Sequence, residues 1–281
     1  VNSLPTASVS GDAVICSGFT SDITIILTGK APWNFTYTNG SDNTTVFTSV
    51  NPYVFPAGTD GIYEVIAVSD ANGCTGTDFG TTATLTVNPG PVLASDLNDA
   101  ACSDVASGIV LDIASGSVAA TSYEIFLNFK DAGLTGTPTT GVGLPDNAIA
   151  GDIFTNTTSV ALTVVYNIVP VSGDGCEGYL VQVTLTVNPE PILNPGLDAG
   201  TCSNAASGIN LSVTAGSVAA TSYNILLNSI DPGLSGTATT GVGLAANAIA
   251  GDIFSNPTTG PLTVVYDIVP VSAVGCEGDM V

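Results

Sequence analysis

Apolar and polar residues alternate along most of this chain, and an alternation with a period of two predicts β-strands that bury one face. In the first third of the chain, four runs show this pattern. Asn39-Gly40 and Asn72-Gly73 are typical of tight hairpin turns between such strands. Additional strands are expected near residues 9–15, 45–50 and 52–55. The residues predicted to point inward are Ile23, Ile25 and Leu27, then Trp33, Phe35 and Tyr37, then Tyr63, Val65 and Ala67, then Ala83, Leu85 and Val87.

The middle third of the chain follows the same plan. Residues 147–156 allow one helical turn, although Gly151 disfavours a longer helix there. The inward rows predicted for this part are Ile109, Leu111 and Ile113, then Tyr123, Ile125, Leu127 and Phe129, then Leu162, Val164, Tyr166 and Ile168, then Val183, Leu185 and Val187.

A long internal repeat divides the chain into domains. Residues 89–181 align with residues 189–281 at a constant shift, and about six positions in ten are identical, which indicates duplication of a whole domain. A repeat of this length suits a β-sandwich. We therefore expect an all-β chain of three tandem sandwich domains, at residues 1–88, 89–188 and 189–281.

The ends of the sequence resemble parts of the repeat. Residues 1–4 look like the tail of a preceding repeat, and the third domain lacks the counterpart of residues 182–188, its expected last strand. We expect a piece of a longer array, with a sheet edge in the third domain that a neighbouring strand completes. The junctions at residues 88–91 and 188–191 read Asn-Pro-x-Pro, and such proline-rich linkers are extended and stiff.

Composition excludes several classes of partner. The chain has 24 acidic residues and only two basic ones, Lys30 and Lys130, so its formal net charge is -22. Such a chain repels phosphate backbones and anionic lipid, and we expect it to bind no nucleic acid. No apolar run is long enough to span a bilayer, so direct membrane insertion is not expected.

Cysteines occur twice in each expected domain. Six cysteines allow 15 pairings, but the repetition favours one pair inside each domain. The expected pairs are Cys16 with Cys74, Cys102 with Cys176, and Cys202 with Cys276. A metal or redox site is the weaker alternative, because the chain has no histidine and no Cys-x-x-Cys motif. Disulfides imply an oxidising, extracytoplasmic location.

Several of these motifs resemble a known family. Cys-Ser near each domain start, AATSY at residues 119–123 and 219–223, VVYxIVPVS, GCEG and a terminal TVNPxP are similar to the PKD-like repeats of giant cell-surface adhesins of Bacteroidota, including gliding-motility adhesins of the SprB type. The resemblance implies immunoglobulin-like (PKD-like) β-sandwiches in a tandem array. It also implies secretion by the type IX route and display on the cell surface, attached to the outer membrane.

Catalysis has little support in this composition. With no histidine and no arginine, acid-base chemistry would need paired carboxylates in a cleft, and the acidic residues lie in turn-like sequence. We therefore predict no catalytic residue and no required cofactor. Calcium remains possible, because it prefers oxygen ligands and acidic loops at domain junctions often supply them. The candidate ligands are Asp96, Asn98, Asp99 and Asp104, with Asp174 and Glu177 as a second set.

Aromatic residues of the first domain offer a different candidate site. Trp33, Tyr37 and Tyr53, together with Phe55, could form a platform for a sugar ring. The alternative is that Trp33, Phe35 and Tyr37 alternate at strand spacing because they form the core.

The leading functional hypothesis is structural. The chain is expected to be a stalk or filament segment of a secreted adhesin linked to gliding motility or surface attachment, without enzymatic activity. Its partners would be neighbouring repeats of the same long chain, and also surface glycans or the secretion and motility machinery. The alternative is an adhesive module that binds a glycan or a protein, with or without calcium.

Overall fold

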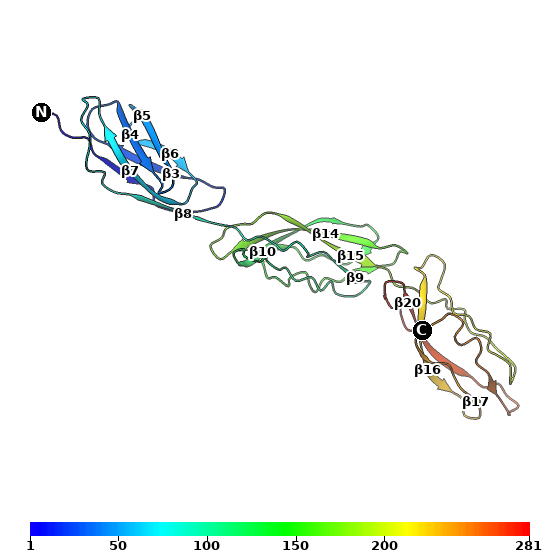
Figure 1. The fold of residues 1–281 in the computed structure, drawn as a ribbon. Coiled ribbons are helices and arrows are strands. Elements are labelled where there is room, and N and C mark those ends of the chain that lie inside the picture. Colours follow the sequence, from blue (N-terminus) through cyan, green and yellow to red (C-terminus); the bar gives the residue numbers. More distant parts are fainter. The chain divides into compact units, whose positions relative to one another are not determined.

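The computed structural model describes all residues from Val1 to Val281, and every regular element in it is a β-strand (Figure 1). It contains no helix with the length and hydropathy of a membrane span. Contacts divide the chain into two compact units. Unit 1 comprises Val1–Leu93, Ile113–Ser122 and Val169–Tyr179, and unit 2 comprises Ala94–Asp112, Tyr123–Ile168 and Leu180–Val281.

The unit boundaries pass through the middle of the sequence repeat, so the division into domains at residues 88 and 188 stays a prediction. Each β-sheet nevertheless falls inside one of the three sequence segments. Below, repeat 1, repeat 2 and repeat 3 denote residues 1–88, 89–188 and 189–281.

Repeat 1 is an immunoglobulin-like sandwich of two sheets. Its larger sheet has the order β2-β8-β7-β4-β5 and the smaller has the order β1-β3-β6. All neighbouring strands run antiparallel except β2 and β8, which are parallel. The strands are β1 (Ala7–Ser10), β2 (Ala13–Cys16), β3 (Ser21–Leu27), β4 (Trp33–Thr38), β5 (Asn43–Thr48), β6 (Tyr53–Ala57), β7 (Gly61–Ser69) and β8 (Ala83–Asn88).

The core of repeat 1 lies where the period of two predicts it, with one exception. Ile23, Ile25, Phe35 and Leu85 are at most 1% exposed. The exception is Ala67, which is exposed, so its predicted inward position is wrong. The pairing of β4 with β7 shifts between Val65 and Ala67, and this β-bulge moves the inward position to Val68.

Repeat 2 has one regular sheet. Its order is β12-β10-β14-β15-β9, with β9 parallel to β15, and a separate pair joins β11 to β13. Its strands are β9 (Asp99–Cys102), β10 (Ala120–Lys130), β11 (Leu134–Thr135), β12 (Gly141–Leu144), β13 (Thr155–Asn156), β14 (Leu162–Ser172) and β15 (Val181–Asn188). The residues at 146–151 form turns and no helix.

Irregular chain covers the inner face of the β10/β14 sheet. The backbone N–H groups of Ser107 and Leu111 donate to the carbonyls of Asp152 and Asp146, which holds two irregular segments side by side. Ile109 and Leu111 are buried as predicted, although they lie in this irregular chain rather than in a strand. Buried apolar side chains thus fix the position of a segment that has few ladder hydrogen bonds of its own.

A buried tyrosine ties the sheet to the irregular chain. The hydroxyl of Tyr166 on β14 donates to Asp152 at 2.5 Å, and Thr139 donates to the same carboxylate from its N–H and its hydroxyl. Burial, the hydrogen bond to Asp152 and the charge of that carboxylate raise the pKa of Tyr166 far above its usual range. Tyr266, Asp252 and Thr239 repeat this arrangement in repeat 3.

The C-terminal half of β10 departs from the predicted pattern. Tyr123 and Ile125 are buried, but Leu127 and Phe129 are 42% and 50% exposed, so their predicted inward positions are wrong. The neighbouring strand β12 pairs with β10 no further than Ile125. The rest of β10 therefore extends along the sheet edge, where alternation alone does not bury a side chain.

Repeat 3 repeats this plan with an open edge. Its sheet has the order β18-β16-β20, and β17 pairs with β19. Val281 exchanges two backbone hydrogen bonds with Ile268, the register that Val181 has with Ile168 in repeat 2. Tyr266 is only half-buried, whereas Tyr166, whose strand β14 pairs with β15 along its length, is fully buried. The strands are β16 (Ala220–Ile230), β17 (Ser235–Gly236), β18 (Gly241–Leu244), β19 (Phe254–Ser255) and β20 (Val264–Ser272).

A tight loop that holds a cysteine follows β7, β14 and β20. In repeat 1, the Asp70 carboxylate accepts hydrogen bonds from the backbone N–H groups of Lys30, Asn72 and Cys74. In repeats 2 and 3, the hydroxyls of Ser172 and Ser272 accept the corresponding bond from Cys176 and Cys276. The N–H of Lys30, followed by those of Cys74 and Asn72, lowers the pKa of Asp70 against the opposing effect of burial.

The lowered pKa of Asp70 predicts a pH-dependent contribution to the stability of repeat 1. Because the folded pKa is depressed, the contribution is present above the unfolded pKa of about 3.9 and is lost as pH falls through the folded value. We expect Asp70→Ser, which copies Ser172, to lower the melting temperature at pH 7. The difference from the parent chain should shrink below about pH 4.

Fluorescence of Trp33, the single tryptophan of the chain and a core residue of repeat 1, provides the measurement. Asp22→Ser is the matched control, because it removes the same charge from an exposed position on β3. A difference between Asp70→Ser and the parent that is independent of pH would contradict the prediction.

Candidate functional site

Two disulfides join successive repeats. Cys16 bonds Cys176 inside unit 1, and Cys102 bonds Cys276 inside unit 2. Cys74 and Cys202 are free thiols. The expectation of one disulfide within each repeat is therefore wrong, since each bond runs from the first cysteine of one repeat to the loop cysteine of the next.

The strand order explains why pairing within a repeat fails. Because β2 runs parallel to β8, Cys16 at its end lies beside Asn88, where the chain leaves repeat 1. Cys74 follows the far end of β7, whose first residue pairs with Leu85 of β8. The length of β7 alone separates these ends by roughly 25 Å at about 3.3 Å per residue. A disulfide here spans only 5.3 Å between its Cα atoms.

Each disulfide belongs to a closely packed joint. We define joint 1 as Cys16, the linker at residues 88–91 and the loop at residues 172–178, and joint 2 as Cys102, residues 188–191 and residues 272–278. At joint 1, the N–H of Ser17 donates to the carbonyl of Asn88 at 2.9 Å. At joint 2, the N–H of Ser103 donates to the carbonyl of Asn188 at 2.8 Å.

Glycine is required where the loop meets the linker. A Cβ atom on Gly178 would lie 1.8 Å from the carbonyl oxygen of Pro91, and one on Gly278 would lie 1.9 Å from that of Pro191. Both contacts are with backbone, which cannot move aside as a side chain can. Any larger residue at these two positions would therefore displace the linker from the loop.

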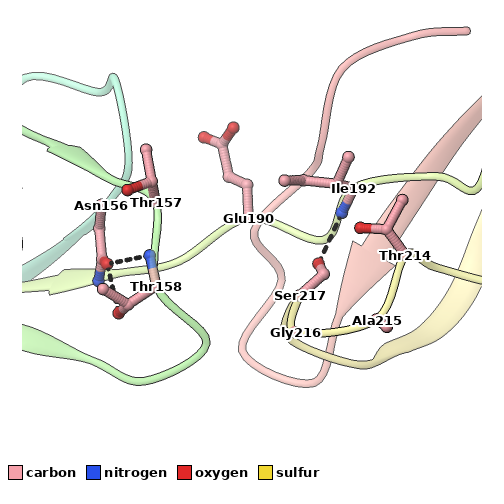
Figure 2. A pocket seen from close by; sticks show the side chains of 9 residues that line it. All are labelled: Asn156, Thr157, Thr158, Glu190, Ile192, Thr214, Ala215, Gly216 and Ser217. Carbon is pink, nitrogen blue, oxygen red and sulfur yellow. Dashed lines mark hydrogen bonds between the residues drawn. The ribbon is translucent and has the colours of Figure 1, made fainter.

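The two joints differ in charge. Glu190 lies in the linker of joint 2, whereas Gly90 occupies the same place in joint 1. Burial, followed by the charges of Asp104 and Asp279, raises the pKa of the Glu190 carboxyl. Figure 2 shows Glu190 between the loop of residues 156–158 and the side chains of Ile192 and Ser217. These residues line a pocket of about 170 Å³.

The candidate calcium ligands make hydrogen bonds to protein groups. Asn98 accepts from the N–H of Thr184 at 2.8 Å, and Asp99 accepts from the N–H of Ala100 at 2.8 Å. Asp104 accepts from the hydroxyls of Thr155 and Ser103, and Asp96 accepts from Ser95. The structure brings no three acidic or cysteine side chains together in a metal-binding group. Calcium binding by these residues stays a prediction.

The predicted aromatic platform is divided between core and surface. Trp33 is only 6% exposed, and its indole N–H donates to the carbonyl of Thr28 at 2.9 Å. The predicted ligand-binding role of Trp33 is therefore wrong, because its ring belongs to the sandwich core. Tyr53 packs edge-on against Phe35 with a centroid distance of 5.4 Å.

Tyr37 lines an open groove in repeat 1, which we call the aromatic groove. Its ring stacks on Phe55 with a centroid distance of 4.6 Å, and Tyr63 continues the row beside Phe55. Polar residues Asn39, Asp42, Thr44 and Thr59 complete the lining of a space of about 250 Å³. The Asn39-Gly40 turn was recognisable in the sequence, but its position beside Phe55 depends on how the two sheets pack.

Residues 115–191 match the sequence profile of a family described as a PKD-like domain, which covers most of repeat 2. The comparison with curated proteins found no match. Similar solved structures include a 1.5-MDa bacterial ice-binding adhesin, with 16% identity over 99% of this chain and 96% of that chain and a TM-score of 0.32.

Two further solved structures are similar at the level of fold. The fibronectin(III)-like modules of Clostridium thermocellum CbhA share 13% identity over 65% of this chain and 94% of that chain, with a TM-score of 0.27. SGBP-B of the Bacteroides ovatus mixed-linkage glucan utilization locus, solved with a mixed-linkage heptasaccharide, shares 15% identity over 95% of this chain and 62% of that chain, with a TM-score of 0.21.

The bonding pattern of the joints predicts a specific outcome for disulfide mapping. Cleavage of the unreduced protein at aspartates, followed by mass spectrometry, should yield a Cys16–Cys176 peptide and a Cys102–Cys276 peptide. Thiol titration of the denatured, unreduced chain should count two thiols, those of Cys74 and Cys202. A cross-linked peptide with both cysteines from one repeat, or a chain without free thiols, would refute the joints described above.

Proposed function

We propose that the chain is a structural segment, a stalk or filament, of a secreted bacterial cell-surface adhesin in which disulfides fasten each repeat to the next. The observation that carries this proposal is the pair of inter-repeat bonds, Cys16–Cys176 and Cys102–Cys276. A bond inside one domain stabilises only that domain. A bond between domains restrains how far the array can be pulled apart.

The fold and the family match support a role without chemistry of its own. Immunoglobulin-like and PKD-like domains are typically structural or binding modules. Disulfides persist in oxidising environments, which supports an extracellular location. Attachment to the outer membrane, gliding motility, type IX secretion and contact with the motility machinery rest on the sequence resemblance and belong to the proposal.

The two bonds overlap along the sequence, and this overlap limits extension. The first bond spans 160 residues and the second spans 174, and each encloses part of the other's loop. Three stretches of chain therefore connect the two bonds in parallel. The shortest is the stretch from Cys102 to Cys176, about 74 residues or roughly 26 nm when fully extended at about 3.5 Å per residue.

Without the two bonds, the stretch that pulling can extend runs from Cys16 to Cys276 and is much longer. It contains about 260 residues, which extend to roughly 90 nm at about 3.5 Å per residue. The disulfides therefore remove more than two thirds of the length that unfolding would release. An array built this way resists overstretching even after its sandwiches unfold.

Single-molecule pulling tests this role. We expect the oxidised chain, pulled from its termini, to extend to roughly 26 nm between its two bonds. After reduction with dithiothreitol, the stretch from Cys16 to Cys276 should extend to roughly 90 nm. The readout is the contour length of the unfolded chain, so it does not depend on refolding after reduction.

The double variant Cys74→Ser/Cys202→Ser is the matched control, because it removes the free thiols and leaves both bonds in place. Its contour lengths should equal those of the parent chain. Equal contour lengths for the oxidised and the reduced parent would exclude a mechanical role for the bonds.

The aromatic groove supports a second candidate function, binding of a glycan. Stacked rings beside polar side chains suit the apolar face and hydroxyl groups of a sugar. The groove combines the stacked pair Tyr37 and Phe55 with Asn39, Asp42 and Thr59. Phe35 pairs with Val68 as Tyr223 pairs with Pro270, so the counterpart of Tyr37 is the buried Ile225 in repeat 3 and Ile125 in repeat 2. The groove would therefore make repeat 1 the recognition module.

Binding to a broad glycan panel, in calcium and again in chelator, tests the second candidate. Saturable binding that Tyr37→Ala weakens by about tenfold or more, while Phe47→Ala does not, would support it, since tenfold corresponds to about 1.4 kcal/mol of lost contact. Phe47 is 74% exposed on the adjacent strand β5 and lies outside the groove. Loss of binding in chelator and in the Asp99→Asn variant would indicate that binding requires calcium. If none of the glycans binds, the glycan-binding proposal is wrong and only the structural role stands.

A further inference from the structure

Strand β5 leaves one row of its backbone groups without a partner in the chain. It is the outermost strand of the larger sheet of repeat 1, and it pairs only with β4, from Asn43 opposite Thr38 to Thr48 opposite Trp33. On the side away from β4, no backbone N–H or carbonyl group of residues 43–48 hydrogen-bonds to another segment. Such an open edge is a template for a further strand.

The other sheet edges of repeat 1 are protected. β1 and β2 contain only four residues each. The backbone N–H groups of Ala7 and Val9 on β1 donate to the carbonyls of Asp78 and Thr81, so a loop covers that edge. β6 contains Pro56, which has no N–H to donate to a further strand. Short strands, covering loops and proline are common protections of a sheet edge.

The sheet edges of repeat 2 are protected in similar ways. β9 and β12 contain four residues each, and β9 begins with the charged residue Asp99. β12 contains Gly141 and Gly143, both with positive φ angles. The part of β10 beyond its last pair with β12 ends in Lys130. Charged residues and short strands discourage pairing with another chain.

β5 has none of these protective features. Its sequence, NTTVFT, contains no charged residue and no proline. Its register with β4 runs without a shift, so no bulge twists the edge away. Val46 packs against the core of repeat 1, and its neighbour Phe47, on the opposite face, is 74% exposed. Threonine, valine and phenylalanine all favour strands, so β5 is suited to a further strand beside it.

The charge around β5 indicates which strand it accepts. β4 and β5 contain no charged residue, although the chain has a formal net charge of -22. A basic segment finds no row of carboxylates to pair with along this edge, and an acidic segment is repelled by the chain as a whole. The complement of the edge is therefore an uncharged strand with high β-propensity. β5 of a second copy is a strand of this kind.

We propose that β5 of one copy of the chain pairs with β5 of a second copy, antiparallel and about a two-fold axis, so that the two larger sheets become continuous. This goes beyond the structural role proposed above, because it adds a lateral contact between two chains. The contact is isologous, and the two edges cover each other, so the pairing closes at a dimer.

A two-fold axis at Val46 gives favourable pairs along the strand. The inward faces of both copies then lie on the same side of the joined sheet. Val46 lies opposite Val46 of the second copy, Thr45 opposite Phe47 of the second copy, and Thr44 opposite Thr48 of the second copy. Pairs of an aromatic with a β-branched residue, and pairs of threonines, stabilise neighbouring strands.

Asp42, which precedes β5, favours the antiparallel direction. In a parallel pairing in register, the Asp42 residues of the two copies would lie on neighbouring strands, about 5 Å apart. In the antiparallel pairing they lie about eight residues apart along the strands, or roughly 26 Å. This separation exceeds the Debye length of about 8 Å at physiological salt, so the repulsion between the two carboxylates is screened.

The size of the contact predicts a weak dimer. A single pair of six-residue strands buries less than the roughly 1,200 Å² typical of stable interfaces. We therefore expect dimers only at high protein concentration. Salt should strengthen the dimer, because it screens the repulsion between two acidic chains.

Sedimentation velocity tests the pairing on the full chain with Cys74→Ser and Cys202→Ser, which prevents disulfides between copies. The weight-average sedimentation coefficient should rise with protein concentration up to about 1 mM, and should rise further with added salt. Phe47→Asp should abolish the rise, because it places two carboxylates diagonally across the axis, about 7 Å apart. Val14→Asp is the matched control, since Val14 is 69% exposed on β2, the opposite edge of the same sheet. This control should dimerise as the parent does.

Hydrogen exchange locates the contact without any substitution in β5. When half of the chains are paired, the outward amides of residues 43–48 should exchange about twofold more slowly than in dilute protein, while those of β2 should not change. An unfolding transition of Trp33 fluorescence close to that of the parent shows that Phe47→Asp is folded.

Three outcomes would overturn the proposal. The first is a sedimentation coefficient that does not depend on concentration. The second is a rise that Phe47→Asp retains or that Val14→Asp also loses. The third is binding of a lysine-flanked NTTVFT peptide by a chain that stays monomeric, which would assign the edge to a basic segment. The pulling experiment on single molecules is unaffected by these outcomes, so failure here is distinguishable from failure of the structural role.

Discussion

The parallel pairing of β2 with β8, and of β9 with β15, is the interaction on which the organisation of this protein depends. Most of the remaining strand pairs run antiparallel, and an antiparallel partner would leave Cys16 at the end where the chain enters the repeat. The parallel pairing instead places Cys16 beside Asn88, where the chain leaves. A short strand of four residues thus decides that the disulfides connect repeats rather than close them.

Connection between repeats changes what the disulfides do for stability. In the chain-entropy model, closing loops of 160 and 174 residues each restricts the unfolded chain by about 5 kcal/mol, although overlapping loops do not contribute additively. The larger effect of the two disulfides is that they link the repeats mechanically. Because the two loops share the stretch from Cys102 to Cys176, unfolding of one repeat cannot extend the chain without loading another.

A buried carboxylate organises the irregular layer of repeats 2 and 3. The Asp152 carboxylate is buried with no basic side chain as partner, and its bonds to Tyr166 and Thr139 hold the irregular chain against the sheet. Tyr266 and Asp252 make the same contact in repeat 3. Such satisfied polar contacts favour one packing arrangement over others, which a largely irregular layer needs because it has few ladder hydrogen bonds. The lining of the aromatic groove in repeat 1 includes no residue of joint 1, so recognition there would not engage that joint directly.

The sequence alone determined most of the long strands, most of their inward faces and the internal repeat. Alternation with a period of two identified Ile23, Ile25, Leu85 and Val164 as core residues, because one buried face is enough to produce that pattern. It also predicted three inward positions wrongly. Ala67 follows a bulge, and Leu127 and Phe129 lie beyond the residues of β10 that pair with β12, so all three errors arise from the pairing between strands.

Tertiary structure decided the cysteine partners and the fate of the aromatic residues. Repetition of two cysteines per repeat is compatible with bonds inside repeats or between them, and only the direction of β2 relative to β8 distinguishes the two. Trp33 and Tyr37 lie on the same strand and the same face, yet one is core and the other lines a groove. Their difference depends on how the second sheet and its loops pack against β4, which no local pattern in the sequence records.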